Sequence, residues 1–461
     1  MHERTLRVLA EHGMRVDTDE GRRILRQSGA RVDEATRMAR LPRSLVEEAL
    51  RSATTTFTLG GRRAGWSHPL NAGACTLLAD GGATSTLDAA TGEQRPCTSD
   101  DWLAAVTLLD FYDDVGLYWC PTDYPADAGT PGGFVRYLAR TFAAFGKHVQ
   151  DSFGDDRLSP WLLEALDIVF GGRQAVAREH PFSFLITPTS PLTIEQRFTD
   201  AWLALRGWDV PVAIMPMPLQ GATAPGSRLS TLLAANCETL GTLCLVQAAA
   251  PGTPVIYAPV IATMDPRSGR YAAGAIEHAV LAVAGCEMAR FYGLPVEASG
   301  LLSEQYEPGI RAGWEKAHSA LLVTLAWPDI LVGPGLLGGA LVLSLEQLVL
   351  DIEVARVARR AREGVPVRDE LWLDEVMARV GPCGSFLSER STRMNVRGGE
   401  WYVSDLDAPG SYEAWRAAGS PTVLDAARER VREILGAHRL LPLPADVAVA
   451  LADLERRATG A

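Results

Sequence analysis

The stretch VAIMPMPLQGATAPGS, Val212 to Ser227, begins as an apolar strand and ends in small residues. Pro216 and Pro218 interrupt it, and because proline has no N–H to donate to a sheet, strand pairing is expected to stop there. The Gly, Ala and Thr that follow leave space at the end of the strand. The segment QGATAP is therefore predicted to form part of a cavity floor.

Similar short apolar runs recur on both sides of this stretch and alternate with longer segments whose apolar residues lie three and four apart. Eight repeats of strand and helix are typical of a closed parallel barrel, whose chemistry lies at the carboxyl ends of the strands. The predicted fold is therefore α/β, a TIM (β/α)8 barrel, and a doubly wound open sheet is the alternative. The runs are residues 75–80, 115–121, 147–153, 182–188, 211–217, 254–260, 294–300 and 329–335.

The chain differs in pattern before and after these repeats. Residues 1–62 contain stretches that open at Thr-Asp or proline and stop at glycine, so an N-terminal helical segment is expected. The barrel is assigned to residues 63–364. Beyond it the alternation ends without an obvious linker, and residues 365–461 are expected to form a C-terminal extension packed on the barrel.

The composition restricts partners and location. A net charge of −12 over 461 residues disfavours nucleic acid and anionic membranes as partners. Met1 to Leu9 is charged from the start, so no secretory signal is predicted and the cytoplasm is expected. The uncharged run 239–264 is broken by APGTP, which favours a buried helix, turn and strand over a membrane span. Seven scattered cysteines without a CxxC predict neither disulfides nor a zinc site.

Familiar catalytic motifs are weak in this chain. GPGLLG, Gly333 to Gly338, fits GxGxxG, but it lies at the eighth strand, so a ligand surface that includes Gly333 and Gly335 is favoured over a dinucleotide site. The two lysines, Lys147 at a strand start and Lys316 in a helix, argue against a Schiff base. The histidines do not cluster and GxSxG is absent, so neither a metal centre nor a serine nucleophile is predicted.

Aromatic and acidic residues remain at the predicted strand ends. Any one of them can be an ordinary core ring or a hydrogen-bonded structural acid, but together they suit a permanently cationic ammonium, which aromatic faces and a carboxylate hold without donating a hydrogen bond. A methyl group on such a nitrogen leaves by direct displacement, without acid–base residues. The set is Tyr118, Trp119, Tyr124, Tyr257, Tyr306 and Trp314, with the acids Glu297 and Glu304. The strand-end acids Asp80 and Asp151 come from separate strands and are expected to be hydrogen-bonded structural acids rather than metal ligands.

An ordered set of stretches runs almost from end to end, among them VLAEHGMRVDTDEGRRILRQSGARVD, MPMPLQGATAP, FYGLPVEASGLLSE and GPCGSFLSERSTR. Together they resemble the trimethylamine methyltransferase family of corrinoid-dependent enzymes. The resemblance implies a TIM barrel and transfer of a methyl group from an amine to the Co(I) of a corrinoid carried by a separate small protein. This chain has no DxHxxG pattern of the kind that ligates cobalt.

Two departures from the family pattern bear on the substrate. The founding members carry pyrrolysine, whereas this chain contains only the standard twenty residues, which shifts the expected substrate towards a quaternary amine such as a betaine. Family members commonly have histidines in the segment that matches FLSERSTRMNV, where this chain has Arg390, Ser391 and Met394. That difference bears on the binding of substrate or partner.

We therefore predict a cytoplasmic methyltransferase that uses a corrinoid (cobalamin) supplied by a small corrinoid-binding protein, and that forms a homo-oligomer as a further possibility. The alternatives are a non-catalytic barrel that binds a quaternary amine, and a methyltransferase with a different methyl donor such as a thioether. Glu297 and Tyr257 are the predicted catalytic residues. The predicted substrate-binding residues are Trp119, Tyr124, Asp151, Thr187, Gln220, Gly221, Tyr306, Gly333 and Gly335.

Overall fold

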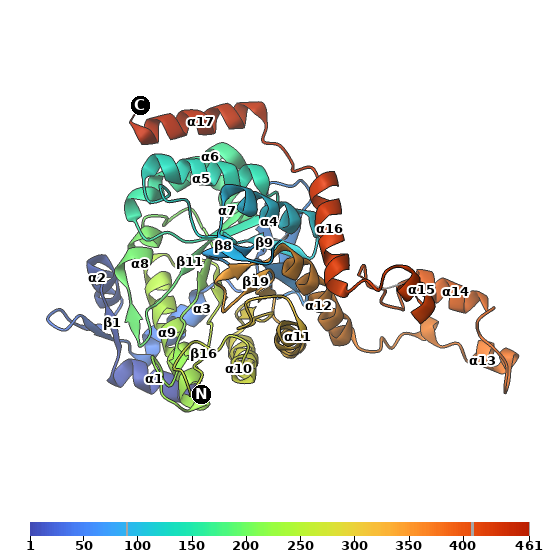
Figure 1. Cartoon of the computed structure of the whole chain (residues 1–461). Coiled ribbons are helices and arrows are strands. Elements are labelled where there is room, and N and C mark those ends of the chain that lie inside the picture. The colour runs from blue at the N-terminus through green and yellow to red at the C-terminus, as the bar shows by residue number, and fades with distance from the viewer. Residues whose placement is uncertain (89–90, 407–409, 461) are drawn as a thin grey trace.

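Eight parallel strands form one sheet in the computed structural model, which describes residues 1–461 except 89–90, 407–409 and 461 (Figure 1). The sheet closes on itself where Tyr257 pairs with Val296, and the Tyr257 N–H donates to the Pro295 carbonyl at 2.8 Å. The predicted TIM barrel is thereby confirmed. Its strands are β6 (Thr76–Leu78), β9 (Val115–Tyr118), β10 (His148–Asp151), β11 (Phe182–Ile186), β13 (Val212–Ile214), β15 (Val255–Tyr257), β17 (Glu297–Ser299) and β18 (Ile330–Val332).

Helices surround the strands, and each strand is joined to the next through one or more of them (Figure 1). Their starts follow the expected capping rules; Thr98 and Ser344, for example, accept a hydrogen bond from the first turn of the helix that each precedes. The helices are α4 (Ser99–Phe111), α5 (Pro131–Ala144), α6 (Ser159–Phe170), α7 (Arg173–Glu179), α8 (Gln196–Leu203), α9 (Arg228–Ala249), α10 (Ile276–Tyr292), α11 (Ile310–Leu325) and α12 (Leu345–Glu363).

Helix α9 is long and apolar enough to cross a membrane by length and composition. However, 78% of its most apolar window is buried inside the protein, against α1, α3, α10 and β13 among others. It is therefore built like the core helix of a globular domain, as predicted for its position in the run 239–264.

The inside of the barrel is apolar near its amino end. Alternate residues of each strand point inward, and Leu117, Leu185 and Ile330 belong to one buried cluster. Phe57, Leu59 and Leu70 join the same cluster from the antiparallel hairpin β4 (Thr58–Gly60) and β5 (Ser67–Pro69). This hairpin closes the amino end, so ligands reach the barrel from the carboxyl end.

Two small sheets lie over the carboxyl ends of the strands. One contains β7 (Ser85–Leu87), β8 (Gln94–Pro96), β19 (Leu336–Leu337) and β20 (Val342–Leu343); the other pairs β14 (Leu219–Gln220) with β16 (Ala262–Thr263). Pro216 and Pro218 lie just before β14 and donate nothing. Their carbonyls still accept from the N–H groups of Val260 and Ala262 at 3.0 and 3.1 Å, so the chain continues beside its neighbour after the barrel strand has ended.

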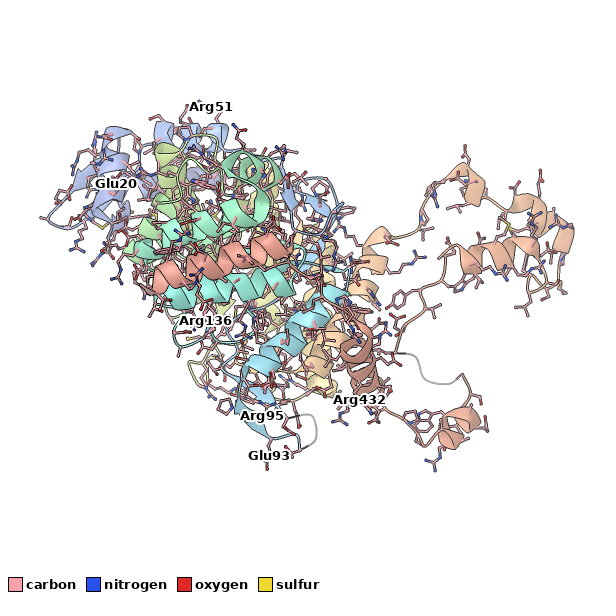
Figure 2. The ribbon with its side chains drawn as sticks, turned by 90° about the horizontal axis from the view of Figure 1, so that it is seen from above. Glu20, Arg51, Glu93, Arg95, Arg136 and Arg432 are labelled. Atoms are coloured by element: carbon pink, nitrogen blue, oxygen red, sulfur yellow. The ribbon has the colours of Figure 1, made fainter. Side chains whose placement is uncertain are left out.

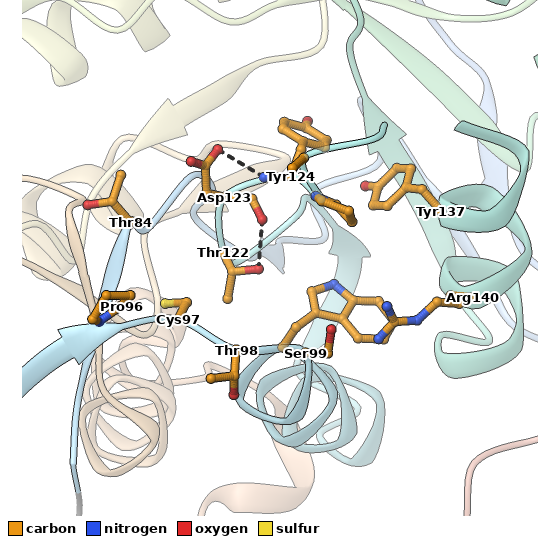
Figure 3. Close-up of a pocket in the computed structure, with 13 residues that line it drawn as sticks. Thr84, Pro96, Cys97, Thr98, Ser99, Thr122, Asp123, Tyr124, Tyr137 and Arg140 are labelled. Carbon is orange, nitrogen blue, oxygen red and sulfur yellow. Dashed lines mark hydrogen bonds between the residues drawn. The ribbon is translucent and has the colours of Figure 1, made fainter. Parts of the chain in front are cut away.

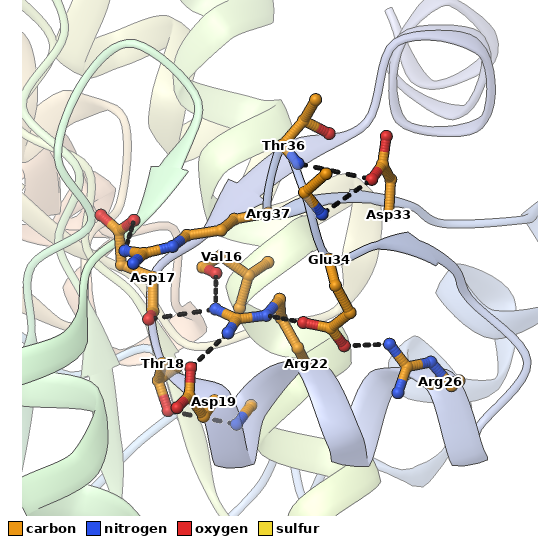
Figure 4. A network of polar contacts seen from close by, with 12 residues as sticks. Val16, Asp17, Thr18, Asp19, Arg22, Arg26, Asp33, Glu34, Thr36 and Arg37 are labelled. Atoms are coloured by element: carbon orange, nitrogen blue, oxygen red, sulfur yellow. Dashed lines mark hydrogen bonds and ion pairs between the residues drawn. The ribbon is translucent and has the colours of Figure 1, made fainter.

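The N-terminal segment contains more than the predicted helices. Helices α1 (His2–Glu11), α2 (Asp19–Gln27) and α3 (Arg43–Ser52) accompany β1 (Met14–Val16), β2 (Arg31–Asp33) and β3 (Met38–Arg40), and β1 pairs with β12 (Thr193–Ile194) of the barrel region. The buried Arg22 ties these elements together. Its guanidinium donates to the Val16 carbonyl and to Glu34 at 2.7 Å each, and it also pairs with Asp19 (Figure 4).

The C-terminal extension has two parts. Helix α16 (Val423–Ala437) lies against α12 and α4, and α17 (Ala445–Thr459) lies along α5 and α6 (Figure 2). Residues 365–399 and 410–421, called the arm below, instead stand away from the barrel, whereas Tyr402 and Ser404 bond to Glu353 of α12 and Leu406 is buried in the core. The prediction that the whole extension packs on the barrel is therefore wrong for the arm, which holds η2 (Asp369–Leu371), α13 (Asp374–Val380), α14 (Arg390–Arg397) and α15 (Tyr412–Ala417) (Figures 1 and 2).

Candidate active site

A chain of polar side chains crosses the inside of the barrel, among its apolar residues. The His148 ring contacts the Ser183 hydroxyl at 2.8 Å, and this hydroxyl donates to Gln150 Oε1 at 3.0 Å. Gln150 Nε2 in turn donates to Glu297 Oε2 at 2.7 Å. Burial lowers the pKa of His148 to about 3, so its imidazole is neutral at physiological pH. The chain therefore ends in the carboxyl group of Glu297, on the opposite side of the barrel.

Only one of the two carboxyl oxygens of Glu297 accepts a hydrogen bond from a described residue. Its Oε1 is buried and has no hydrogen-bond partner among the described residues. Burial raises the pKa of this carboxyl to about 7, although the hydrogen bond from Gln150 acts in the opposite direction. A buried carboxyl oxygen without a partner is costly, and a cation beside it would relieve that cost and lower the pKa again.

Asp80 presents a second unpaired oxygen at the carboxyl end of the first strand. It follows the inward-facing Leu78 by two residues. Its Oδ1 accepts from the Gly81 N–H at 3.0 Å, whereas Oδ2 is buried without a partner among the described residues. Burial raises the pKa of Asp80 to about 6. Sequence reasoning noted Asp80 as a strand-end acid but did not select it for the site.

Trp119 lies beside Asp80, at the end of the second strand. Its indole packs on the inner cluster of the barrel and against the backbone of Gly81, where an added Cβ would come within 2.7 Å of the ring. The glycine thus lets the indole approach the chain. Asp80, Trp119, Gln150 and Glu297 are called the barrel-centre site below. They combine an aromatic face with two carboxyl oxygens that lack hydrogen-bond partners in the described part of the chain.

Tyr271 belongs to a loop over this site that sequence reasoning missed. Burial, with the charges of Asp80 and Glu304, raises the pKa of the Tyr271 hydroxyl, which places it near both acids. Its ring lies against Gly339, and the ring of Tyr306 lies against Gly338, each glycine with a positive φ. The predicted residue Tyr306 is itself half exposed, so it forms part of the rim rather than of a buried cage.

The mouth of the barrel holds a cavity of about 470 Å³. Gln220 and Gly221, both predicted, line it together with the opposing Thr263, whose hydroxyl donates to Gln220 Oε1 at 3.2 Å. Burial raises the pKa of Glu304 at this cavity, as do the charges of Glu315 and Asp265. The charged lining residues are Asp265, Arg267, Glu277, Glu304 and Arg311. Acids thus outnumber bases at the entrance.

In the glycine loop at strand eight, the N–H groups of Gly333 and Gly335 bond within the protein. The Gly333 N–H faces the Leu78 carbonyl at 3.4 Å, and an added Cβ at Gly333 would lie 2.0 Å from the Gly300 carbonyl oxygen. The Gly335 N–H donates to Asp351 at 2.8 Å. Both glycines therefore serve close backbone packing, and their contact with substrate stays a prediction.

Tyr257 also lies elsewhere than predicted. It follows the inward-facing Ile256 and so points outward, where its hydroxyl donates to Asn236 of α9 at 3.0 Å. The side chain is fully buried between the barrel wall and the helices. Tyr257 therefore cannot touch a ligand inside the barrel, and its predicted catalytic role is wrong.

Tyr124 and Asp151 meet each other but not the barrel-centre site. Asp151 accepts from the hydroxyls of Tyr124 and Tyr137, the second at 2.5 Å, and Tyr137 comes from α5 on the outside of the barrel. Burial raises the pKa of Asp151 to about 6 against the effect of these two hydrogen bonds. The predicted residue Thr187 follows β11 and is half-buried. Within the described ranges, no three His, Cys, Asp or Glu side chains gather as metal ligands would.

The fold and the site define a (β/α)8-barrel protein with acidic and aromatic groups at the carboxyl ends of its strands. Comparison with known proteins specifies the family: the model of the trimethylamine methyltransferase (MTTB) family matches residues 1–461. The chain therefore belongs to this family and is a methyltransferase. It lacks pyrrolysine, as its sequence shows.

Individual relatives agree with this assignment. The chain is 29% identical over 455 residues to trimethylamine methyltransferase MttB1 of Methanosarcina acetivorans, covering 97% of this chain and 91% of the relative. It is 28% identical over 421 residues to the glycine betaine methyltransferase of Desulfitobacterium hafniense, covering 90% and 86%. Among solved structures, the monomethylamine methyltransferase of Methanosarcina barkeri aligns over 93% of this chain and 92% of its own, with 12% identity and a TM-score of 0.45.

Proposed function

We propose that this enzyme transfers a methyl group from a small quaternary amine, of the betaine type, to the Co(I) corrinoid of a separate small protein. The observation that carries the proposal is the pair of buried carboxyl oxygens without a partner among the described residues, Asp80 Oδ2 and Glu297 Oε1, on side chains that face the barrel interior as the indole of Trp119 does. The glycine betaine methyltransferase among the relatives supports the same class of substrate.

A quaternary ammonium fits these groups better than a primary amine does. Its charge is spread over methyl groups that donate no conventional hydrogen bonds, so it binds through aromatic faces and through carboxylates in its field. A protonated amine would instead need acceptors arranged around its N–H groups. The barrel-centre site offers an aromatic face and acidic oxygens, and its Gln150 is already bonded on both sides.

The reaction places few demands on proton transfer. The bond between the methyl carbon and nitrogen breaks, its electron pair stays on nitrogen, and the substrate leaves as a neutral tertiary amine. A Co(I) corrinoid would supply the nucleophile that takes the methyl group. This chain's residues hold the cation, fix its orientation and exclude water. Ionised Asp80 and Glu297 bind the cationic substrate more tightly than the neutral product, which favours product release.

The rim of the mouth suits a docked partner. Met217, Tyr306 and Leu341 are about half exposed and follow the fifth, seventh and eighth strands. Exposed apolar side chains around a cavity are typical of a protein interaction site. Among the described residues, helices α16 and α17 of the C-terminal extension contact the outer helices of the barrel and not its mouth. A large planar cofactor on a partner protein could therefore approach the substrate from above.

A further part of the proposal is that the enzyme acts as a cytoplasmic homo-oligomer. Helices α13, α14 and α15 of the arm have no buried residue. The arm nevertheless exposes large apolar side chains, including Val365, Trp372 and Leu387. Because burial of such side chains must offset the entropy cost of ordering a segment, the arm needs a partner surface. A second copy of the chain offers one on the exposed apolar side chains of α10 and α11, Ile276, Val280, Ile310 and Trp314.

The function is tested by mixing the purified chain with reduced cobalamin and a panel of betaines while the Co(I) absorbance is followed. Loss of that absorbance with one betaine, abolished in Asp80→Asn and Glu297→Gln, supports the proposal. Tyr257→Phe is the control and retains activity, because this ring lies outside the barrel. Binding of a betaine without methyl transfer would favour the non-catalytic alternative, and inactivity towards all betaines with activity towards a thioether would favour another methyl donor.

A further inference from the structure

A second pocket lies on the flank of the barrel, outside the ring of strands (Figure 3). It has a volume of about 360 Å³, within the range of small-molecule sites. Its walls come from the start of α4, the loop after β9 and the inner face of α5. The flank pocket is lined by Thr84, Pro96, Cys97, Thr98, Ser99, Trp102, Thr122, Asp123, Tyr124, Pro125, Ala126, Tyr137 and Arg140.

One wall of the pocket is rigid. The hydroxyls of Tyr124 and Tyr137 both donate to Asp151, and Tyr137 also contacts the Tyr118 hydroxyl at 3.1 Å. The two rings are 5.4 Å apart at a steep angle of 69°. Trp102 joins the same network, since its Nε1 donates to Tyr118 at 3.1 Å. All the polar atoms of this aromatic wall are occupied, so the wall offers a ligand apolar surface.

Arg140 supplies the one positive charge among the lining residues. Its guanidinium lies over the Trp102 ring, 4.7 Å from the centroid, and reaches the pocket from α5 (Figure 3). It makes no hydrogen bond or ion pair with any described residue. Stacking occupies the flat face of a guanidinium and leaves its N–H edge free, and that edge matches the two oxygens of a carboxylate. Arg140 is half-buried and its N–H groups face the pocket without a partner among the described residues, so it is well placed to bind an anion.

The surroundings of Arg140 favour a single negative charge. Thr98 and Ser99, at the amino end of the 13-residue helix α4, line the same pocket, but the Asp101 carboxylate already caps this end by accepting from the Thr98 N–H at 2.8 Å, so Arg140 is the main group that favours an anion. Asp123 is the one acid among the lining residues, and its Oδ1 already accepts from the Tyr124 N–H at 2.9 Å. Its charge would repel a phosphate dianion, whereas Arg140 can neutralise one carboxylate.

We propose that the flank pocket is a second binding site, for a small organic monocarboxylate whose carboxylate pairs with Arg140 and whose apolar part lies on Trp102 and Pro125. This inference does not depend on the proposed methyl transfer. Its residues lie outside the barrel-centre site, and its test needs neither corrinoid nor methyl donor.

Binding is tested by calorimetry on the full chain with benzoate, propionate and inorganic phosphate. Saturable binding of at least one carboxylate, with phosphate at least roughly tenfold weaker, is expected. Arg140→Gln weakens carboxylate binding roughly 10- to 100-fold, because a charge-assisted bidentate contact is lost. Arg140→Lys keeps the positive charge but lacks the paired N–H groups of a guanidinium. Its affinity for the carboxylate is therefore expected to lie between those of the native chain and Arg140→Gln.

Arg136→Gln is the matched control. Arg136 lies one turn earlier on α5, is exposed, and pairs with Asp127 at 2.6 Å and Glu455 at 2.8 Å instead of facing the pocket. Thermal unfolding of each variant verifies that the fold is intact. Three results would overturn the proposal: no carboxylate binding by the native chain, equal binding by Arg140→Gln, or phosphate binding as tight as that of the carboxylates.

Discussion

The buried ion pair between Lys316 and Asp351 gives the sharpest stability prediction. Both side chains are fully buried, between α11 and α12, and Lys316 Nζ lies 2.8 Å from Asp351 Oδ2. The same ammonium donates to the Leu301 carbonyl at 2.6 Å, and Asp351 accepts from the Gly335 N–H. The pair thus holds the loops that follow the seventh and eighth strands over the barrel mouth.

Replacing Lys316 with methionine keeps most of the volume but leaves Asp351 without its cation. Removal of one partner from a buried pair typically costs about 3–5 kcal/mol of unfolding free energy. Burial already raises the pKa of Asp351, and Lys316 is the main group that lowers it. In Lys316→Met the carboxyl therefore binds a proton more tightly in the folded chain than in the unfolded one. The variant loses stability as the pH rises, beyond any loss in the native chain.

Lys147, the other lysine of the chain, provides the control for this substitution. Lys147 is also buried, but it donates to the carbonyls of Leu109 and Tyr112 instead of pairing with an acid, at 3.2 and 2.7 Å. Lys147→Met is expected to lower the unfolding free energy by about 1–2 kcal/mol. Little pH dependence is added, because this substitution leaves no buried acid without its cation. Guanidinium unfolding at pH 6 and pH 8, followed by tryptophan fluorescence, measures all three chains. A loss below about 1 kcal/mol in Lys316→Met, or a loss independent of pH, would refute the reasoning.

Four further predictions follow from individual contacts. Affinity for a betaine should rise roughly tenfold from pH 6 to pH 8 as Glu297, with a pKa of about 7, loses its proton, and calorimetry on Glu297→Gln should show no such rise. Tyr257→Phe should lower the unfolding free energy by about 1–2 kcal/mol through the lost bond to Asn236, with methyl transfer unchanged in a single-turnover assay. Gly333→Ala should destabilise the fold and slow methyl transfer together, because the added Cβ would lie 2.0 Å from the Gly300 carbonyl oxygen; an unaltered melting curve would contradict this packing. Replacing Trp372 and Leu387 with serine should shift the mass measured by light scattering towards the monomer, whereas an unchanged mass would exclude the arm as a subunit contact.

The barrel could be predicted from sequence because its signal repeats. Each of the eight strands falls inside an apolar run, and the intervening segments have helical spacing. The two small sheets over the mouth could not be predicted in this way. Four of their strands, β14, β16, β19 and β20, are two residues long, too short for any alternation to be visible. The sequence of the arm likewise does not distinguish apolar residues that pack on their own barrel from apolar residues that pack on another surface.

The site was only partly predictable because the direction of a side chain depends on register. Ile256 and Tyr257 are adjacent in a strand and face opposite sides, so a one-residue difference separates a barrel-facing ring from one buried under the helices. Glu297 opens β17 instead of following it, and it faces the barrel interior, where Gln150 reaches it from the opposite wall. Tyr271 comes from a loop with no periodic pattern, and no sequence signal distinguishes it from other loop aromatics.

Binding of a quaternary cation at the barrel-centre site underlies the proposed function. It is tested most directly by comparing, in calorimetric titrations, glycine betaine with 3,3-dimethylbutanoate, in which an uncharged carbon replaces the nitrogen at nearly the same shape. The betaine is expected to bind at least roughly tenfold more tightly, and the double variant Asp80→Asn with Glu297→Gln is expected to remove the difference. Equal affinity of the native chain for the two compounds would contradict it.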